Sequence, residues 1–262
     1  MQQGQTREES YIPPQHAPFG QAHEAEFAPG QWKDPRAQLH GGVEKFMAGV
    51  YGWMAAAVLV TAGVVAMISQ SAAALKFLYG INVYTQTMEP TAMRWVVLLA
   101  PVGFVMLLGN KMLRMGPAAG QAMLIIYAAL IGGMLGYIPL VYDGGSIAGI
   151  FLVSAGMFAA MSAFGYFTKK DLTGLGQFLS MAVIGLIIAW VVSFIFPEVY
   201  FAMAAVGVLI FAGLTAYDTQ NIKQIYMTQG GRGNLAIIGA LQLYISLVNI
   251  FIFLLHLFGS RD

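Results

Sequence analysis

Residues 235–258 read LAIIGALQLYISLVNIFIFLLHLF, a stretch that contains no Asp, Glu, Lys or Arg. A helix needs about 20 predominantly apolar residues to cross the hydrocarbon core of a bilayer. This stretch meets that length and holds only a few polar side chains, among them a histidine near its end. It is therefore predicted to be a transmembrane α-helix.

Six more apolar runs precede this one along the chain. They cover residues 46–69, 92–109, 118–141, 146–167, 176–196 and 199–222. The runs are rich in Ala, Gly, Leu and Met and lack the alternation of apolar and polar residues that marks a membrane β-barrel. The sequence thus predicts an all-α integral membrane protein, a bundle of seven transmembrane helices. The boundary between the fifth and sixth runs is the least clear, because Phe196-Pro197-Glu198 leaves room for only a tight turn. Six or eight helices are therefore the alternatives.

The composition indicates that lipid is the solvent for most of the chain. Hydrophobic residues make up 58% of the 262 residues, charged residues only 10%, and the mean hydropathy is +0.69. A soluble domain carries about 25% charged residues. The net charge of +1 argues against nucleic-acid binding, and the absence of cysteine excludes disulfides and thiolate metal sites.

Basic residues predict the orientation, because the cytosolic loops of membrane proteins are enriched in Lys and Arg. The segment before the first helix and every second loop after it are basic. These residues are Lys33, Arg36 and Lys45, then Lys111 and Arg114, Lys169 and Lys170, and Lys223 and Arg232. The third and fifth loops carry only Asp143 and Glu198, and the first loop is mixed. The N-terminus is therefore predicted in the cytosol and the C-terminus outside.

Residues 1–42 differ from the rest of the chain. They are rich in Gln, Pro, Gly, His and Glu and poor in aliphatic residues. Such a segment buries too little apolar area to offset the conformational entropy lost on folding. It is predicted to be a disordered cytosolic tail, acting as a tether or docking a partner, ahead of a membrane domain at residues 43–262.

Small residues four apart predict close helix packing, because they share one helix face and let backbones approach in lipid. Three such pairs are Gly132/Gly136, Gly145/Gly149 and Gly185/Ala189.

The last apolar run carries a stripe of polar residues. Gln242, Ser246 and Asn249 lie at positions i, i+4 and i+7, and His256 continues the stripe near the outer end. This spacing places them on one helix face, which must meet protein or water because unpaired polar groups are costly in hydrocarbon. The stripe is either interhelical hydrogen bonding or the lining of an aqueous path, and the spacing alone leaves both open.

Asp218 closes the apolar part of the run at residues 199–222. An acidic residue inside a spanning segment is by default a functional candidate. It could equally be solvated at the cytosolic end of its helix. The apolar period continues through Ile222 and Ile225, which predicts that the helix extends beyond Asp218.

Catalytic constellations are missing from the sequence. No zinc-binding HExxH motif occurs, and serines such as Ser154 and Ser162 have no histidine in a neighbouring segment to act as a base. We therefore expect no enzymatic activity and no cofactor.

Four segments resemble the Bax inhibitor family, the transmembrane Bax-inhibitor-motif proteins. They are GLTAYDTQNIK at residues 213–223, LQLYISLVNIF at 241–251, VYGWM at 50–54 and GYFTKKDL at 165–172. The resemblance covers about residues 44–259 and is nearest to bacterial members. It implies a multi-pass protein of the cell (inner) membrane, a seven-helix bundle with the last helix central.

The activity implied by the resemblance is a pH-sensitive leak of calcium ions. In the family two aspartates near the cytosolic side share a proton or pair with a basic residue. Asp218 matches the first aspartate, and Ser246 stands at the place of the second. Arg114 or Lys111 could then pair with Asp218, and Gln242, Ser246 and Asn249 could offer a calcium ion neutral oxygens beside the Asp218 carboxylate.

A second implication follows from the serine at position 246 and from the ending Gly259-Ser260-Arg261-Asp262. Both look like a bacterial branch of the family that includes a modulator of the membrane-anchored protease FtsH. The alternative function is therefore non-conducting regulation of FtsH or of another membrane complex.

Overall fold

The computed structural model describes residues 35–81, 88–112, 115–230 and 234–261. The chain divides into two compact units, Met1–Gly42 and Val43–Asp262, and the helix contacts below belong to the second. The elements in chain order are α1 (Pro35–Gln70), α2 (Ala72–Leu78), β1 (Tyr79–Ile81), β2 (Met88–Pro90), α3 (Ala92–Met112), α4 (Pro117–Leu135), the 3-10 turn η1 (Ile138–Leu140), α5 (Gly144–Phe167), α6 (Thr173–Val192), α7 (Val199–Gln229) and α8 (Leu235–Phe258).

The prediction of an all-α membrane protein is confirmed at this level. Six helices in the described part of the chain, α1 and α4 to α8, are long and apolar enough to cross a membrane. The seventh predicted segment, residues 92–109, falls on α3, whose apolar part is shorter and covers Ala92–Leu107. Polar Asn110 and Lys111 follow that part, and Pro101 lies inside the continuous helix.

The helices also extend beyond the apolar runs that predicted them. α1 begins at Pro35, inside the predicted tail, because proline suits the first turn of a helix. Residues 1–34 of that tail lie outside the described residues. α7 continues past Asp218 to Gln229, as predicted, and ends at Gly230, whose φ of 71° favours glycine.

The first loop contains more structure than the sequence indicated. After α2, strands β1 and β2 pair antiparallel, with Gly80 opposite Glu89. Thr91 closes this hairpin, since its backbone N–H donates to the carbonyl of Leu78 at 3.0 Å.

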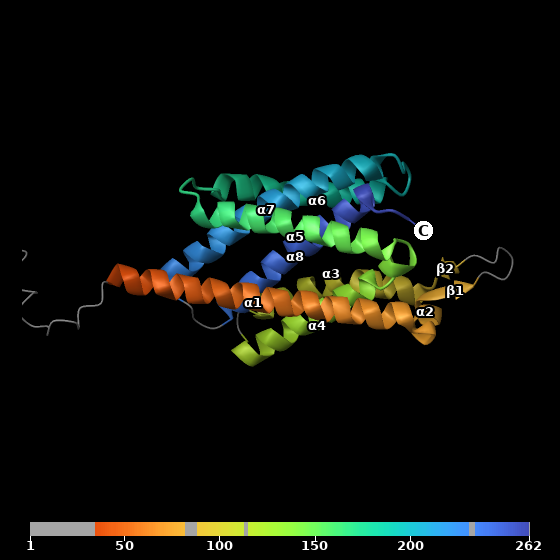
Figure 1. Cartoon of the computed structure of the whole chain (residues 1–262), viewed down its shortest axis with the longest axis horizontal. Coiled ribbons are helices and arrows are strands. Elements are labelled where there is room, and N and C mark those ends of the chain that lie inside the picture. The colour runs from red at the N-terminus through yellow and green to blue at the C-terminus, as the bar shows by residue number, and fades with distance from the viewer. Residues whose placement is uncertain (1–34, 82–87, 113–114, 231–233, 262) are drawn as a thin grey trace, which may run out of the picture. The chain divides into compact units, whose positions relative to one another are not determined.

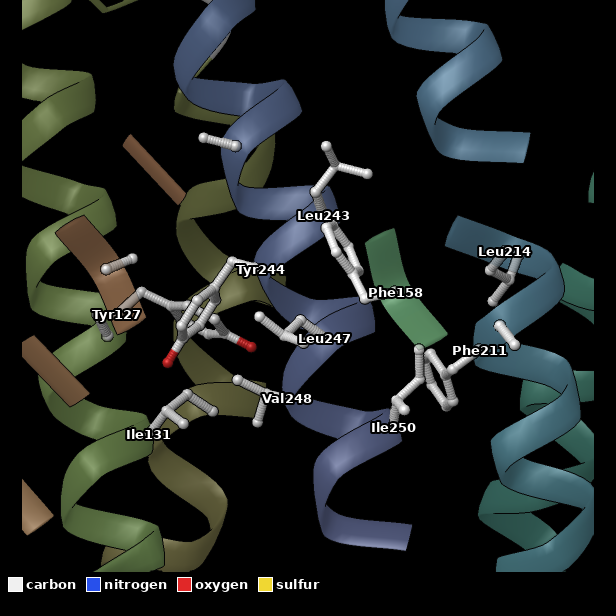
Figure 2. Packing of buried hydrophobic residues seen from close by; sticks show 14 of the residues in the cluster. Tyr127, Ile131, Phe158, Phe211, Leu214, Leu243, Tyr244, Leu247, Val248 and Ile250 are labelled. Carbon is white, nitrogen blue, oxygen red and sulfur yellow. The ribbon is translucent and has the colours of Figure 1, made fainter. Parts of the chain in front are cut away.

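Helix α8 packs against α7, α5 and α4 (Figure 1). One side of it carries Tyr244 and Val248 toward Tyr127 of α4, while Leu243 and Ile250 lie on the side of Phe158 and Phe211 (Figure 2). Tyr244, Leu243 and Ile250 are fully buried. A helix covered on opposite sides needs apolar residues on more than one face, which agrees with a sequence that contains no Asp, Glu, Lys or Arg.

Only one of the three predicted small-residue pairs lies in a tight helix contact. A Cβ atom on Gly132 would come within 2.7 Å of Val64 Cβ, and one on Gly136 within 2.6 Å of Ile68 Cγ2, so α4 packs closely on α1 there. Gly149 and Gly185 have open space at the corresponding positions. For these two pairs the prediction of close packing was wrong, because the spacing of small residues specifies a face but not a neighbour.

Candidate functional site

Asp218 lies within α7, and its carboxylate faces α8. The hydroxyl of Ser246 donates a long hydrogen bond of 3.4 Å to Asp218 Oδ2. Ser246 is buried and Asp218 is partly buried. The structure therefore brings together the two residues that the resemblance paired.

The remaining polar residues of α8 have other partners. Asn249 Nδ2 donates to the carbonyl of Ile245 in its own helix at 2.8 Å. Gln242 is partly buried and makes no side-chain hydrogen bond with the described residues. His256, predicted near the outer end, lies 2.9 Å through Nδ1 from the hydroxyl of Tyr200 on α7. Of the stripe, only Ser246 reaches Asp218.

No ion pair to Asp218 forms among the described residues. Lys111 is exposed, and Arg114 lies outside the described part of the chain. Lys223, five residues after Asp218, donates from Nζ to the carbonyl of Tyr166 at 2.9 Å and lies 4.4 Å from the centre of the Tyr166 ring. That lysine is thus held at the C-terminal end of α5, where a cation is favourable.

A chain of hydroxyl groups joins three helices through the residue that follows Asp218. The Tyr51 hydroxyl of α1 lies 2.5 Å from Ser162 Oγ of α5, and Ser162 Oγ lies 2.9 Å from Thr219 Oγ1 of α7. Ser162 and Thr219 are buried, and Thr219 follows Asp218 directly. Tyr51 and Thr219 both fall in segments that resemble the family, but spacing within single helices gave no signal that they would meet.

The α5–α6 loop is tied to the turn of α7 that follows Asp218. The backbone N–H of Leu172 donates to Gln220 Oε1 at 2.9 Å, and Gln220 Nε2 donates to the carbonyl of Lys170 at 2.8 Å. In the same loop the hydroxyl and backbone N–H of Thr173 hydrogen-bond Asp171 and lower the pKa of its exposed carboxyl. Two hydrogen bonds to the Gln220 side chain therefore hold this loop against α7.

The hydroxyl chain predicts a difference between two serines of α5. Ser162→Ala removes contacts to two other helices and should lower the free energy of unfolding by about 1 kcal/mol, since interhelical hydrogen bonds average about 0.6 kcal/mol each. Ser154→Ala is the matched control, because among the described residues buried Ser154 bonds only to Ile150 O in its own helix. Denaturation with an anionic detergent compares the two variants. Equal losses in the free energy of unfolding would contradict the interhelical role of Ser162.

The described residues contain no cluster of side chains that could form a metal-binding site. No group of three or more His, Asp or Glu side chains gathers there. A bound calcium ion takes six to eight oxygen ligands, and Asp218 and Ser246 together supply fewer.

Comparison with known proteins identifies the family of this chain. Residues 43–262 match the family model described as "Inhibitor of apoptosis-promoting Bax1". An uncharacterized protein of Caulobacter vibrioides is 42% identical over 229 residues, which cover 85% of this chain and 91% of that protein. Inner membrane protein YbhL of Escherichia coli is 37% identical over 235 residues, covering 87% of this chain and 97% of YbhL. The uncharacterized protein RP147 of Rickettsia prowazekii is 35% identical over 225 residues, which cover 84% of this chain and 91% of RP147.

The resemblance seen in the four short segments is thus confirmed over the whole membrane domain. The match begins at residue 43, within α1, and runs through Asp218 and Ser246. The chain belongs to the Bax inhibitor family of membrane proteins.

Proposed function

We propose that this chain is a pH-sensitive, calcium-permeable cation leak channel of the bacterial inner membrane. The observation that carries the proposal is the Asp218 carboxylate within α7, facing Ser246 of α8 at 3.4 Å and without an ion pair among the described residues. A charge placed inside a membrane bundle is costly, and such a residue marks an ion or proton path by default. Protonation of Asp218 removes that charge and so links passage of a cation to pH.

The topology belongs to the same proposal. α3 would be the seventh membrane helix, with its apolar Ala92–Leu107 as the spanning part. The N-terminus would be cytosolic, because the basic loops alternate with acidic ones. The name of YbhL places that relative in the inner membrane, and we infer the same location for this chain.

Calcium flux into proteoliposomes tests the channel and its pH sensor. The wild-type chain is expected to give a flux that differs between about pH 6 and pH 8, whereas Asp218→Asn should remove that difference because an amide does not titrate in this range. Asp143→Asn is the matched control, since exposed Asp143 caps α5 through a 2.8 Å bond from Ser146 N and asparagine caps equally well.

The outcomes separate the proposal from its rival. A pH response in Asp218→Asn equal to the wild type would remove Asp218 from the mechanism. Absence of flux at both pH values, with folded protein confirmed, would contradict conduction itself.

The second candidate function is regulation of the membrane-anchored protease FtsH or another membrane complex without conduction. It is favoured by Ser246, which leaves one carboxylate where a two-carboxylate sensor needs two. Deleting residues 1–42 tests the tail, because loss of FtsH co-purification would assign the docking to that segment. Unchanged capture would exclude the tail as the docking segment.

A further inference from the structure

An apolar cavity of about 490 Å³ lies on the other side of α8 from Asp218. Its walls come from α1 between Val58 and Gln70, from α5 between Gly144 and Phe151, and from α8 between Tyr244 and Phe251, with further residues from the end of α4 and η1. All three helices are among those able to span a membrane. The cavity therefore lies at membrane depth.

The hydroxyl groups of the cavity wall are hydrogen-bonded within the protein, and the amide of Gln70 is exposed at the rim. Thr61 Oγ1 lies 2.6 Å from the Tyr244 hydroxyl and 3.0 Å from the carbonyl of Ala128, so these groups bond one another across α1, α4 and α8. Ser69 Oγ donates to Ala66 O at 3.1 Å. The rest of the wall is mainly aliphatic and aromatic, and apolar cavities of this kind do not hold water or ions. The cavity is thus unsuited to be a stretch of the ion path.

The cavity opens toward the lipid between α1 and α5. Ala62 and Ala66 of α1 and Ala148 of α5 all line it and are all exposed. Their short side chains leave a lateral gap, and the medium around these helices is hydrocarbon. An occupant can therefore enter sideways from the bilayer.

The length of the cavity matches one leaflet. Val58 and Gln70, the first and last α1 residues of its wall, are separated by about 18 Å at a rise of about 1.5 Å per residue, and Thr61 lies about 14 Å from Gln70. The whole hydrocarbon core is about 30 Å thick. Gln70 ends α1, and Gly144 at the start of α5 lies on the same rim, so this rim is at the membrane surface.

We propose that this cavity binds one acyl chain of a phospholipid from the leaflet that contains the end of α1 and the start of α5. The chain would run from the rim at Gln70 and Gly144 to the Thr61–Tyr244 pair. The volume is consistent with this occupant. An apolar cavity of about 150 Å³ holds one benzene, so this one accommodates roughly three such units, on the order of 18 carbon atoms.

Photo-crosslinking of the full chain in liposomes tests the site. The probe is a phosphatidylethanolamine with a diazirine in the middle of one acyl chain, and labelled residues are mapped by mass spectrometry. Cavity residues such as Val65, Phe151 and Val248 should be labelled several-fold more than Leu59 and Leu152, which face outward from α1 and α5. Labelling that is no higher inside the cavity than at Leu59 and Leu152 would overturn the proposal.

Filling the cavity supplies the second arm of the experiment. Ala62→Phe and Ala148→Phe should each lower labelling of Val248 several-fold, whereas Ala160→Phe, on an exposed part of α5 outside the cavity, should leave it unchanged. Ala62 is exposed, so its variant is expected to fold, as a monodisperse elution profile would verify. Unchanged labelling in a folded Ala62→Phe, or labelling by a free photoreactive fatty acid but not by the phospholipid, would overturn the proposal.

Discussion

Gly165→Val is expected to destabilise the folded bundle by about 3 kcal/mol or more, at the upper end of overpacking effects. A Cβ atom on Gly165 of α5 would overlap the carbonyl oxygen of Ala216 on α7, and a backbone carbonyl cannot rotate away as a side chain can. α7 would have to move in the turn just before Asp218. The expected result is a large fall in the midpoint of detergent denaturation and little folded protein in the membrane.

Gly156→Val provides the control on the same helix. Gly156 is exposed, and a Cβ atom there would meet nothing within 4 Å. Each variant replaces one glycine of α5 with valine, so the effects of helix propensity cancel in the comparison. A Gly165→Val protein as stable as Gly156→Val would show that the α5–α7 approach is not needed for the fold.

Much of the fold follows from the sequence, because hydrocarbon tolerates few polar residues. Apolar length predicted the spans at α4 to α8 and the greater part of α1. It did not predict the start of α1 at Pro35, since lipid has no influence on residues that precede the apolar run. The sequence also did not predict which helices pack against one another. Gly132 and Gly149 look alike in the sequence, yet only Gly132 packs against another helix.

The candidate site was predictable only in part. Asp218 stood out because a charge inside an apolar run is rare, and the family resemblance pointed to Ser246 as its partner. The link from Tyr51 through Ser162 to Thr219 was not predictable, because each hydroxyl is ordinary in its own helix. Such a link depends on the rotation and depth of three helices, and these are set by packing rather than by local sequence.

Ser246→Asp is expected to enlarge the pH response of the calcium flux between about pH 6 and pH 8. The new carboxylate would face Asp218, since Ser246 Oγ already lies 3.4 Å from Asp218 Oδ2. Two carboxylates about 4 Å apart repel by about 4 kcal/mol at an effective dielectric constant of about 20. They cannot both ionise cheaply and would share a proton, so the charge of the pair would titrate in two coupled steps.

Ser246→Asn separates charge from size in this experiment. Asparagine is close to aspartate in volume and can hydrogen-bond Asp218, but it adds no titrating group. Flux that depends on pH more strongly in Ser246→Asp than in both the wild type and Ser246→Asn would assign the sensor to the face between α7 and α8. If the two variants share one pH profile, the carboxylate at position 246 has no influence on conduction, and Asp218 would have to act with a group other than its α8 neighbour.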